Sequence, residues 1–148
     1  MRSGVRIGLD FGSKRIGVAR CDRDGLISLP LAVLEADGDW CSQLEVLVRE
    51  SEPLEFVVGL PVSLRGRAEL AVDSVHEQVR HLQAAFPQIP VRGVDERLSS
   101  ATANRQLKEA GYSTRDARQL VDALAAAGIL DFALDIERRT GSPAGELL

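Results

Sequence analysis

The chain has 148 residues, 45% of them hydrophobic and 27% charged, which is typical of a globular protein with a packed core. Its net charge of −4 argues against a protein that coats nucleic acid without specificity. The two cysteines, Cys21 and Cys41, have no metal-ligand spacing, so we expect reduced thiols in a cytoplasmic protein. The sequence predicts neither a signal peptide nor a membrane-spanning segment.

The first part of the chain predicts three strands. Apolar residues alternate over 5–10 and again over 15–21, with a turn-like Gly-Ser-Lys-Arg stretch where the two meet. A third strand is expected over 26–33, after a polar turn. Pro30 within it suits an edge strand, because proline has no N–H for a hydrogen-bond ladder. These three strands can form an antiparallel meander.

The rest of the chain predicts alternating helices and strands. We expect helices over 42–51, 68–86, 99–110 and 113–139, and strands over 55–61 and 91–95. Parallel strands need crossover connections, so helices should cover both faces of a mixed five-stranded sheet. This order is the ribonuclease H-like arrangement, although the order alone leaves other α/β folds open. We expect a single domain over 5–139, with disordered ends at 1–4 and 140–148.

Carboxylates stand at two strand ends and inside one apolar helix. Asp10 ends the first strand, and Asp95 and Glu96 end the fifth. Asp122 lies in the apolar part of the last helix, on the side opposite Asp131. Sheet enzymes place ligands at strand ends. Successive strand side chains point to opposite faces, so only one of the acids at the end of the fifth strand can share a site with Asp10; the alternation does not decide which.

Three such carboxylates suit a hard divalent cation, Mg²⁺ or Mn²⁺, and no histidine or thiol site competes. Two ions of this kind support phosphodiester hydrolysis. Basic residues near these positions are expected to contact the phosphates of a nucleic acid, with ordinary exposed surface as the alternative interpretation. They are Lys14, Arg15, Arg65, Arg67, Arg97, Arg115 and Arg118.

Four segments, DFGSKRIGVA, VVGLP, VDERLSS and VDALAAAGIL, follow one another at separations that resemble the YqgF/RuvX family of ribonuclease H-like nucleases. The resemblance covers about residues 5–136. It implies a metal-dependent nuclease that matures the 5′ end of precursor 16S ribosomal RNA; members have also been discussed as Holliday-junction resolvases. It places an acidic triad on Asp10, Glu96 and Asp122, and so favours Glu96 over Asp95. Where many members carry a lysine before the helix aspartate, this chain has arginines.

Other functions remain open from the sequence. The first segment also resembles the first phosphate motif of actin-like and sugar-kinase ATPases, but a chain of 148 residues lacks their second domain. A non-catalytic RNA-binding or scaffold protein is a further alternative. The partner is expected to be nucleic acid, either precursor ribosomal RNA or a four-way DNA junction, and not a membrane. A junction resolvase should be a two-fold homodimer, whereas an RNA-trimming enzyme can act as a monomer.

Overall fold

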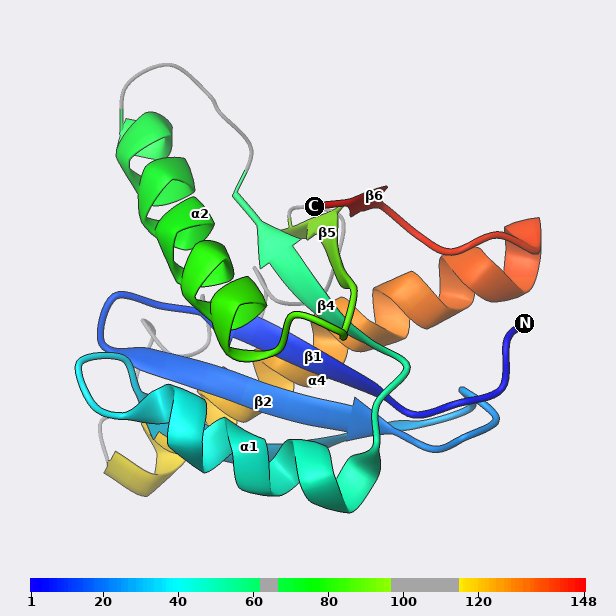
Figure 1. Cartoon of the computed structure of the whole chain (residues 1–148), viewed down its shortest axis with the longest axis horizontal. Helices are drawn as coiled ribbons and strands as arrows, with labels where there is room; N and C mark the ends of the chain where they lie inside the picture. Colours follow the sequence, from blue (N-terminus) through cyan, green and yellow to red (C-terminus); the bar gives the residue numbers. More distant parts are fainter. Residues whose placement is uncertain (62–66, 97–114) are drawn as a thin grey trace.

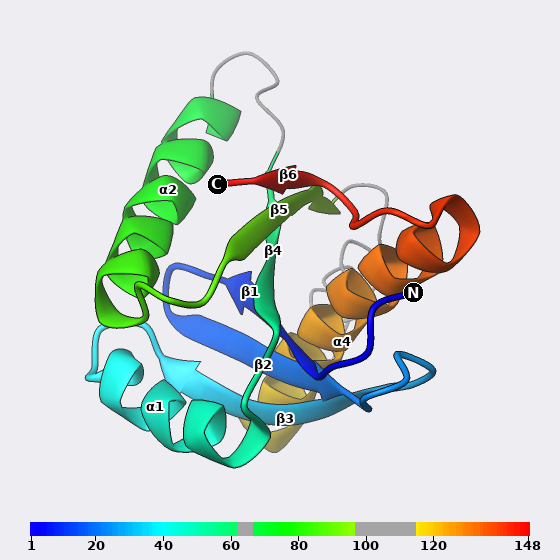
Figure 2. The same ribbon diagram turned by 45° about the vertical axis from the view of Figure 1, so that its right-hand side comes forward.

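A mixed sheet with helices on both faces forms the protein. The computed structural model describes residues 1–61, 67–96 and 115–148, with the side chains of 67–73 and 115–119 outside the described part. Helices α1 and α2 cover one face of the sheet and α4 crosses the other (Figures 1 and 2). The strands are β1 (Arg6–Phe11), β2 (Arg15–Cys21), β3 (Ser28–Glu35), β4 (Glu55–Leu60), β5 (Val91–Asp95) and β6 (Glu146–Leu147). The helices are α1 (Trp40–Ser51), α2 (Arg67–Ala85) and α4 (Arg115–Thr140).

The strand order is β3-β2-β1-β4-β5-β6. Strands β1, β2 and β3 pair antiparallel as a meander, and β4 and β5 pair parallel to β1 and β4. This confirms the ribonuclease H-like arrangement expected from the sequence. Pro30 lies in β3 at one edge of the sheet, as its chemistry predicts. The expected helix over 99–110 lies outside the described residues.

The ends of the domain differ from the sequence prediction. The C-terminal tail was expected to be disordered, but β6 pairs antiparallel with β5 and adds a sixth strand. The backbone N–H of Leu148 donates to the carbonyl of Val91 at 2.9 Å, which extends this pairing. At the other end, Arg2 forms ion pairs with two buried glutamates. Local composition predicts mobile ends, whereas these contacts depend on residues distant in the sequence.

The third strand begins two residues later than predicted, at Ser28. The side chain of Asp22 explains the shift, because its Oδ1 accepts hydrogen bonds from the backbone N–H groups of Leu26 at 2.8 Å and Ile27 at 2.9 Å. Such a side-chain bond competes with strand pairing and extends the turn.

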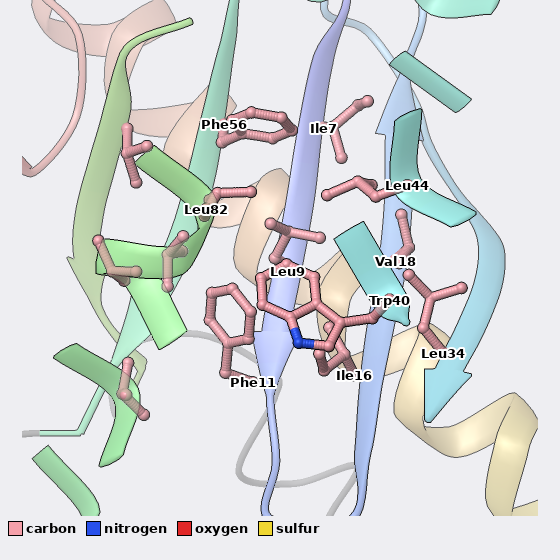
Figure 3. Close-up of a cluster of buried hydrophobic side chains, with 14 residues drawn as sticks. Ile7, Leu9, Phe11, Ile16, Val18, Leu34, Trp40, Leu44, Phe56 and Leu82 are labelled. Carbon is pink, nitrogen blue, oxygen red and sulfur yellow. The ribbon is translucent and has the colours of Figure 1, made fainter. Parts of the chain in front are cut away.

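The face under α1 and α2 holds the larger core (Figure 3). Ile7, Leu9 and Phe11 point to this face from β1, as alternation requires. The ring of Phe11 meets that of Trp40 edge to face at a centroid distance of 5.6 Å. The first turn of α1 is thereby fixed beside the end of β1.

The face under α4 is built differently. Small side chains let the helix lie close to the sheet, and Ala19, Ala126 and Ala127 form one such contact. The alternation that directs apolar side chains to α1 and α2 directs Arg6 and Asp10 to the α4 face. Both are buried, at 1% and 5% exposure. The α4 face therefore carries a buried charge at each end of β1. No helix in the described part of the chain is long and apolar enough to cross a membrane.

Candidate active site

Asp10 occupies the second-last position of β1. It pairs with Gly17 of β2, and the side chains of two directly paired residues point to the same face of a sheet. Strand β1 pairs with β4 up to Leu9 and Val58, so the next residues along, Asp10 and Gly59, are also neighbours. Asp10 thus lies between two glycines.

Gly17 brings Asp122 to Asp10. A Cβ atom added to Gly17 would lie 2.0 Å from the carbonyl oxygen of Asp122, so the backbone of α4 rests directly on β2 at this point. Only glycine permits this approach, because any other side chain would occupy the place of the helix backbone. Asp122 is itself buried, at 9% exposure. Two acidic residues far apart in the sequence therefore lie close to each other on one face of the sheet.

Gly59 brings Glu96 to the same face. A Cβ atom on Gly59 would lie 2.6 Å from Cδ1 of Ile129 in α4 and 3.3 Å from Cβ of Glu96. The side chain of Glu96 therefore leaves the backbone on the α4 side of the sheet. Asp95 pairs with Leu60, whose side chain packs against the core on the opposite side. Of the two acids at the end of β5, Glu96 is the one that shares a face with Asp10.

A guanidinium binds one of these acids. Nε of Arg15 donates to Oδ2 of Asp122 at 2.5 Å. Arg15 begins β2 two residues before Gly17, so its side chain points to the same face as the glycine and reaches the helix above. Arg15 thus binds a carboxylate while its side chain is 21% exposed, and it does not extend fully into solvent.

The turn between β1 and β2 is tied down at two points. The N–H of Gly12 donates to the carbonyl of Arg15 at 3.0 Å, and Nε2 of Gln78 in α2 donates to the carbonyl of Gly12 at 3.2 Å. Lys14 lies on this turn and is exposed. The turn therefore presents Lys14 to solvent from a fixed backbone.

The remaining basic residues that the sequence predicts as phosphate contacts cannot be placed beside the acids. Arg65 and Arg97 lie outside the described residues. Arg67 begins α2 and Arg115 begins α4, with Arg118 in the following turn, but the side chains of all three lie outside the described part.

The donor chemistry of the three acids fits a divalent cation of the Mg²⁺ or Mn²⁺ class, which prefers carboxylate oxygens. Asp10, Glu96 and Asp122 come from two strand ends and one helix and share one face. Within residues 1–61, 74–96 and 120–148, no three histidine, cysteine or acidic side chains are gathered closely enough to form a metal group. Arg15 already supplies a positive charge to Asp122. The acids thus share a face without forming a closed metal cage.

A second set of charges lies at the other end of the same face. Glu55 and Glu137, at 4% and 3% exposure, bind three arginines. Arg6 pairs with Glu137 at 2.5 Å, Arg92 pairs with Glu55 at 2.9 Å, and Arg2 bridges both glutamates. Burial lowers the pKa of Arg2, but its hydrogen bonds to the two glutamates outweigh burial and raise it. Together these residues form a buried ion network, which we call the N-terminal charge cluster.

Sequence reasoning did not single out Gly17 or the N-terminal charge cluster. A signal for each was present. Glycine in a strand interior often marks close approach by another backbone, and Gly17 stands in an otherwise apolar strand. Arg6 and Glu55 each stand in a buried strand, where charges require partners of opposite sign.

Comparison with known proteins identifies the family of the chain. A family model described as "RuvX: Holliday junction resolvase" matches residues 4–136. A Cutibacterium acnes protein named "Putative pre-16S rRNA nuclease" is 42% identical over 132 residues, covering 89% of this chain and 82% of the relative. A Streptomyces coelicolor protein of the same name is 40% identical over 148 residues, covering 99% and 89%.

A solved structure shares the fold. "T. thermophilus RuvC in complex with Holliday junction substrate" superposes with a TM-score of 0.58 at 20% sequence identity, covering 98% of this chain and 99% of that chain. Since the family model matches residues 4–136, which is nearly the whole chain, the chain belongs to the RuvX family.

Proposed function

We propose that the protein is a divalent-cation-dependent nuclease that hydrolyses phosphodiester bonds in structured nucleic acid. One observation supports this more than any other. Asp10 lies between two glycines, and each glycine lies against another acidic residue, Asp122 on one side and Glu96 on the other. Three acids from distant parts of the chain on one face offer the carboxylate oxygens that a hard divalent cation prefers.

Asp10, Glu96 and Asp122 would hold the cation, with Mg²⁺ or Mn²⁺ as the candidates. When bound, such an ion polarises the phosphoryl oxygens and supplies a water of lowered pKa. The protein residues keep the acids in place: Gly17 fixes the height of α4 above β2, and Ile129 packs over Gly59. In the reaction, water oxygen bonds to phosphorus, the bond to the leaving sugar oxygen breaks, and that oxygen gains a proton.

Lys14 is positioned to contact a phosphate of the substrate. It is exposed on the turn next to Asp10, and Gln78 helps hold that turn. A lysine ammonium acts as a point charge toward phosphate without fixing its orientation. Arg67, Arg115 and Arg118 remain proposed contacts, together with Arg65 and Arg97.

We propose precursor 16S ribosomal RNA as the substrate, processed at its 5′ end in the cytoplasm. Relatives at 42% and 40% identity carry the name "Putative pre-16S rRNA nuclease". A four-way DNA junction is the second candidate, favoured by the family description and by the fold shared with a junction-bound resolvase. The acids would bind the cation, and the bound cation would contact the phosphate backbone that both substrates share.

The test is cleavage of two labelled substrates in Mg²⁺ and in Mn²⁺: an RNA carrying a precursor 16S 5′ leader, and a four-way DNA junction. Asp122→Asn is compared with wild type. Asp131→Asn is the matched control, because Asp131 lies on the same helix but is exposed to solvent. Residual cleavage that is equal in all three proteins would indicate a contaminating nuclease.

Each outcome of this cleavage test supports a different function. RNA cleavage that Asp122→Asn abolishes and Asp131→Asn preserves supports ribosomal RNA processing. Paired symmetric nicks in the junction, with the RNA left whole, support the resolvase function and imply a two-fold dimer. Cleavage of neither substrate would contradict the proposal and favour an RNA-binding or scaffold role.

A further inference from the structure

The contact between Arg15 and Asp122 joins β2 to α4 at the candidate active site. Nε of Arg15 lies 2.5 Å from Oδ2 of Asp122, which makes the contact a charge-assisted hydrogen bond. Arg15 is thus the counter-ion of a carboxylate that we propose as a cation ligand.

Solvent reaches this pair more readily than the comparable pair at the other end of the sheet. The side chains of Arg15 and Asp122 are 21% and 12% exposed, whereas those of Arg6 and Glu137 are 1% and 4% exposed. An arginine that is partly exposed can change rotamer without opening the core. Arg6 cannot, because its guanidinium also donates to backbone carbonyls of Gly4 and Arg2. The Arg15 pair is therefore suited to exchange its partner.

A guanidinium and a divalent cation compete for one carboxylate. Two positive charges held beside the same carboxylate repel each other, and the repulsion is stronger where water screens it less than in bulk solvent. By linkage, whatever weakens the hold of Arg15 on Asp122 strengthens cation binding there by the same factor. Arg15 should therefore lower the affinity of the site for the cation.

We infer that Arg15 is an exchangeable counter-ion: it pairs with Asp122 until a divalent cation takes the carboxylate, and it then binds a phosphate of the substrate. This inference rests on the proposed function, because it needs a cation site at Asp122. It also explains why Arg15 contacts an acid although it directly follows the exposed Lys14. The planar fork of a guanidinium matches phosphate oxygens, so the released side chain has a suitable second partner.

The position of Arg15 supports the second half of the exchange. It directly follows the β1–β2 turn, which Gln78 holds through the carbonyl of Gly12. The backbone of Arg15 is therefore anchored, and its side chain lies on the face that carries the acids. A phosphate bound near Asp10 would lie on this face.

The first experiment measures Mn²⁺ binding to the whole protein by titration calorimetry. Arg15→Gln removes the competing charge and should tighten Mn²⁺ binding by about tenfold, the factor that corresponds to one charge-assisted hydrogen bond. Arg15→Lys keeps a positive charge and should bind Mn²⁺ nearly as wild type does. Arg20→Gln is the matched control, because Arg20 is an exposed arginine near the far end of the same strand. It should leave the affinity unchanged.

The second experiment measures substrate affinity against salt concentration, with a precursor 16S leader RNA and Ca²⁺ in place of Mg²⁺. One phosphate contact contributes about one unit to the slope of log affinity against log salt. Arg15→Gln should reduce that slope by about one in Ca²⁺ and should not change it in EDTA. An equal reduction in both buffers would show that Arg15 binds phosphate without exchanging, and would overturn the inference.

The two proposals fail in distinguishable ways. If Asp122→Asn binds Mn²⁺ as tightly as wild type does, the proposed cation site is wrong, and the inference about Arg15 fails with it. If Asp122→Asn loses Mn²⁺ binding while Arg15→Gln binds no more tightly than Arg20→Gln, the site stands and the exchange alone is wrong. Tighter binding in Arg15→Gln that disappears when Asp122→Asn is added supports both.

Discussion

The α4 face of the sheet carries buried charges at both ends, and the two ends differ in how these charges are arranged. The N-terminal charge cluster joins three arginines to two glutamates in interlocking ion pairs. At the other end, Asp10, Glu96 and Asp122 are brought together by two glycines, and Arg15 pairs with one of them. Strands β1, β4 and β5 and helix α4 contribute to both ends, and β2 contributes only to the second.

The paired acids at the two ends differ in solvent access, although arginines at both ends are partly exposed. Glu55 and Glu137 are almost fully buried, so their partners are set when the protein folds. Asp122 and Arg15 are reached by solvent, so their contact can be replaced by another. We assign the buried network of ion pairs to the stability of the fold, and we propose that the acids around Asp10, one of them in a partly exposed ion pair, bind a ligand. Four changes test this contrast, in order of decreasing effect.

Asp10→Asn should lower the cleavage rate by about a hundredfold or more, because loss of groups that merely orient ligands already costs 10- to 100-fold. The substitution keeps the shape of the side chain, so the melting temperature should change little. Rates come from initial velocities in Mg²⁺, and melting from circular dichroism. A variant that is inactive because it is unfolded would contradict the separation of the two ends.

Glu137→Gln should lower the free energy of unfolding by about 3 kcal/mol, because the buried charge of Arg6 loses its carboxylate partner. Turnover of the folded variant should match wild type. Urea denaturation measures the stability. Glu45→Gln breaks an exposed pair with Arg49 and serves as control, with no measurable change expected. Loss of turnover without loss of stability would show that the N-terminal charge cluster takes part in catalysis.

Gly17→Ala should destabilise the protein by about 1–3 kcal/mol, the usual cost of an overpacked contact. The added Cβ would meet the backbone of Asp122, which cannot move without shifting α4. Cleavage should fall as well, because Asp122 moves relative to Asp10. Gly38→Ala is the matched control, since the nearest atoms to its added Cβ lie at 3.5 Å. Thermal unfolding and cleavage assays measure the two effects. Unchanged cleavage would contradict the role of Gly17 in positioning Asp122.

The smallest effect concerns thiol reactivity. Burial raises the pKa of both Cys21 and Cys41, so the reactive thiolate is scarce near neutral pH and alkylation should be slow, rising with pH. Sγ of Cys21 accepts from the backbone N–H of Arg6 at 3.2 Å. Glu137→Gln should therefore speed iodoacetamide labelling of Cys21 but not of Cys41, measured by mass spectrometry. Equal acceleration at both thiols would indicate global unfolding instead of local loosening.

Local patterns predict much of this fold. The alternation in β1 and β2 and the spacing in α2 depend on near neighbours, so these elements follow from the sequence, whereas their order alone left other α/β folds open. The start of β3 was wrong by two residues because one side chain, that of Asp22, extends the preceding turn. The strand β6 was missed because it is only two residues long and depends on β5 for its pairing.

The candidate site likewise has a part that the sequence predicts and a part that it does not. Asp10 and Asp122 are predictable, since each is a charge in an apolar setting. Alternation alone left Asp95 and Glu96 open, and the register of β5 with β4 separates them. The contact of Arg15 with Asp122 was not predictable. It depends on the distance between α4 and β2, which Gly17 sets by packing against a helix that is distant in the sequence.

The most direct test of the central claim is a crystal of the protein soaked in MnCl₂, with anomalous diffraction locating the ion. The account predicts a peak within about 2–2.5 Å of carboxylate oxygens of Asp10 and Asp122. It also predicts that Arg15 has left Asp122 in that crystal. A peak at a different place, or none at saturating Mn²⁺ with Arg15 still on Asp122, would contradict the account.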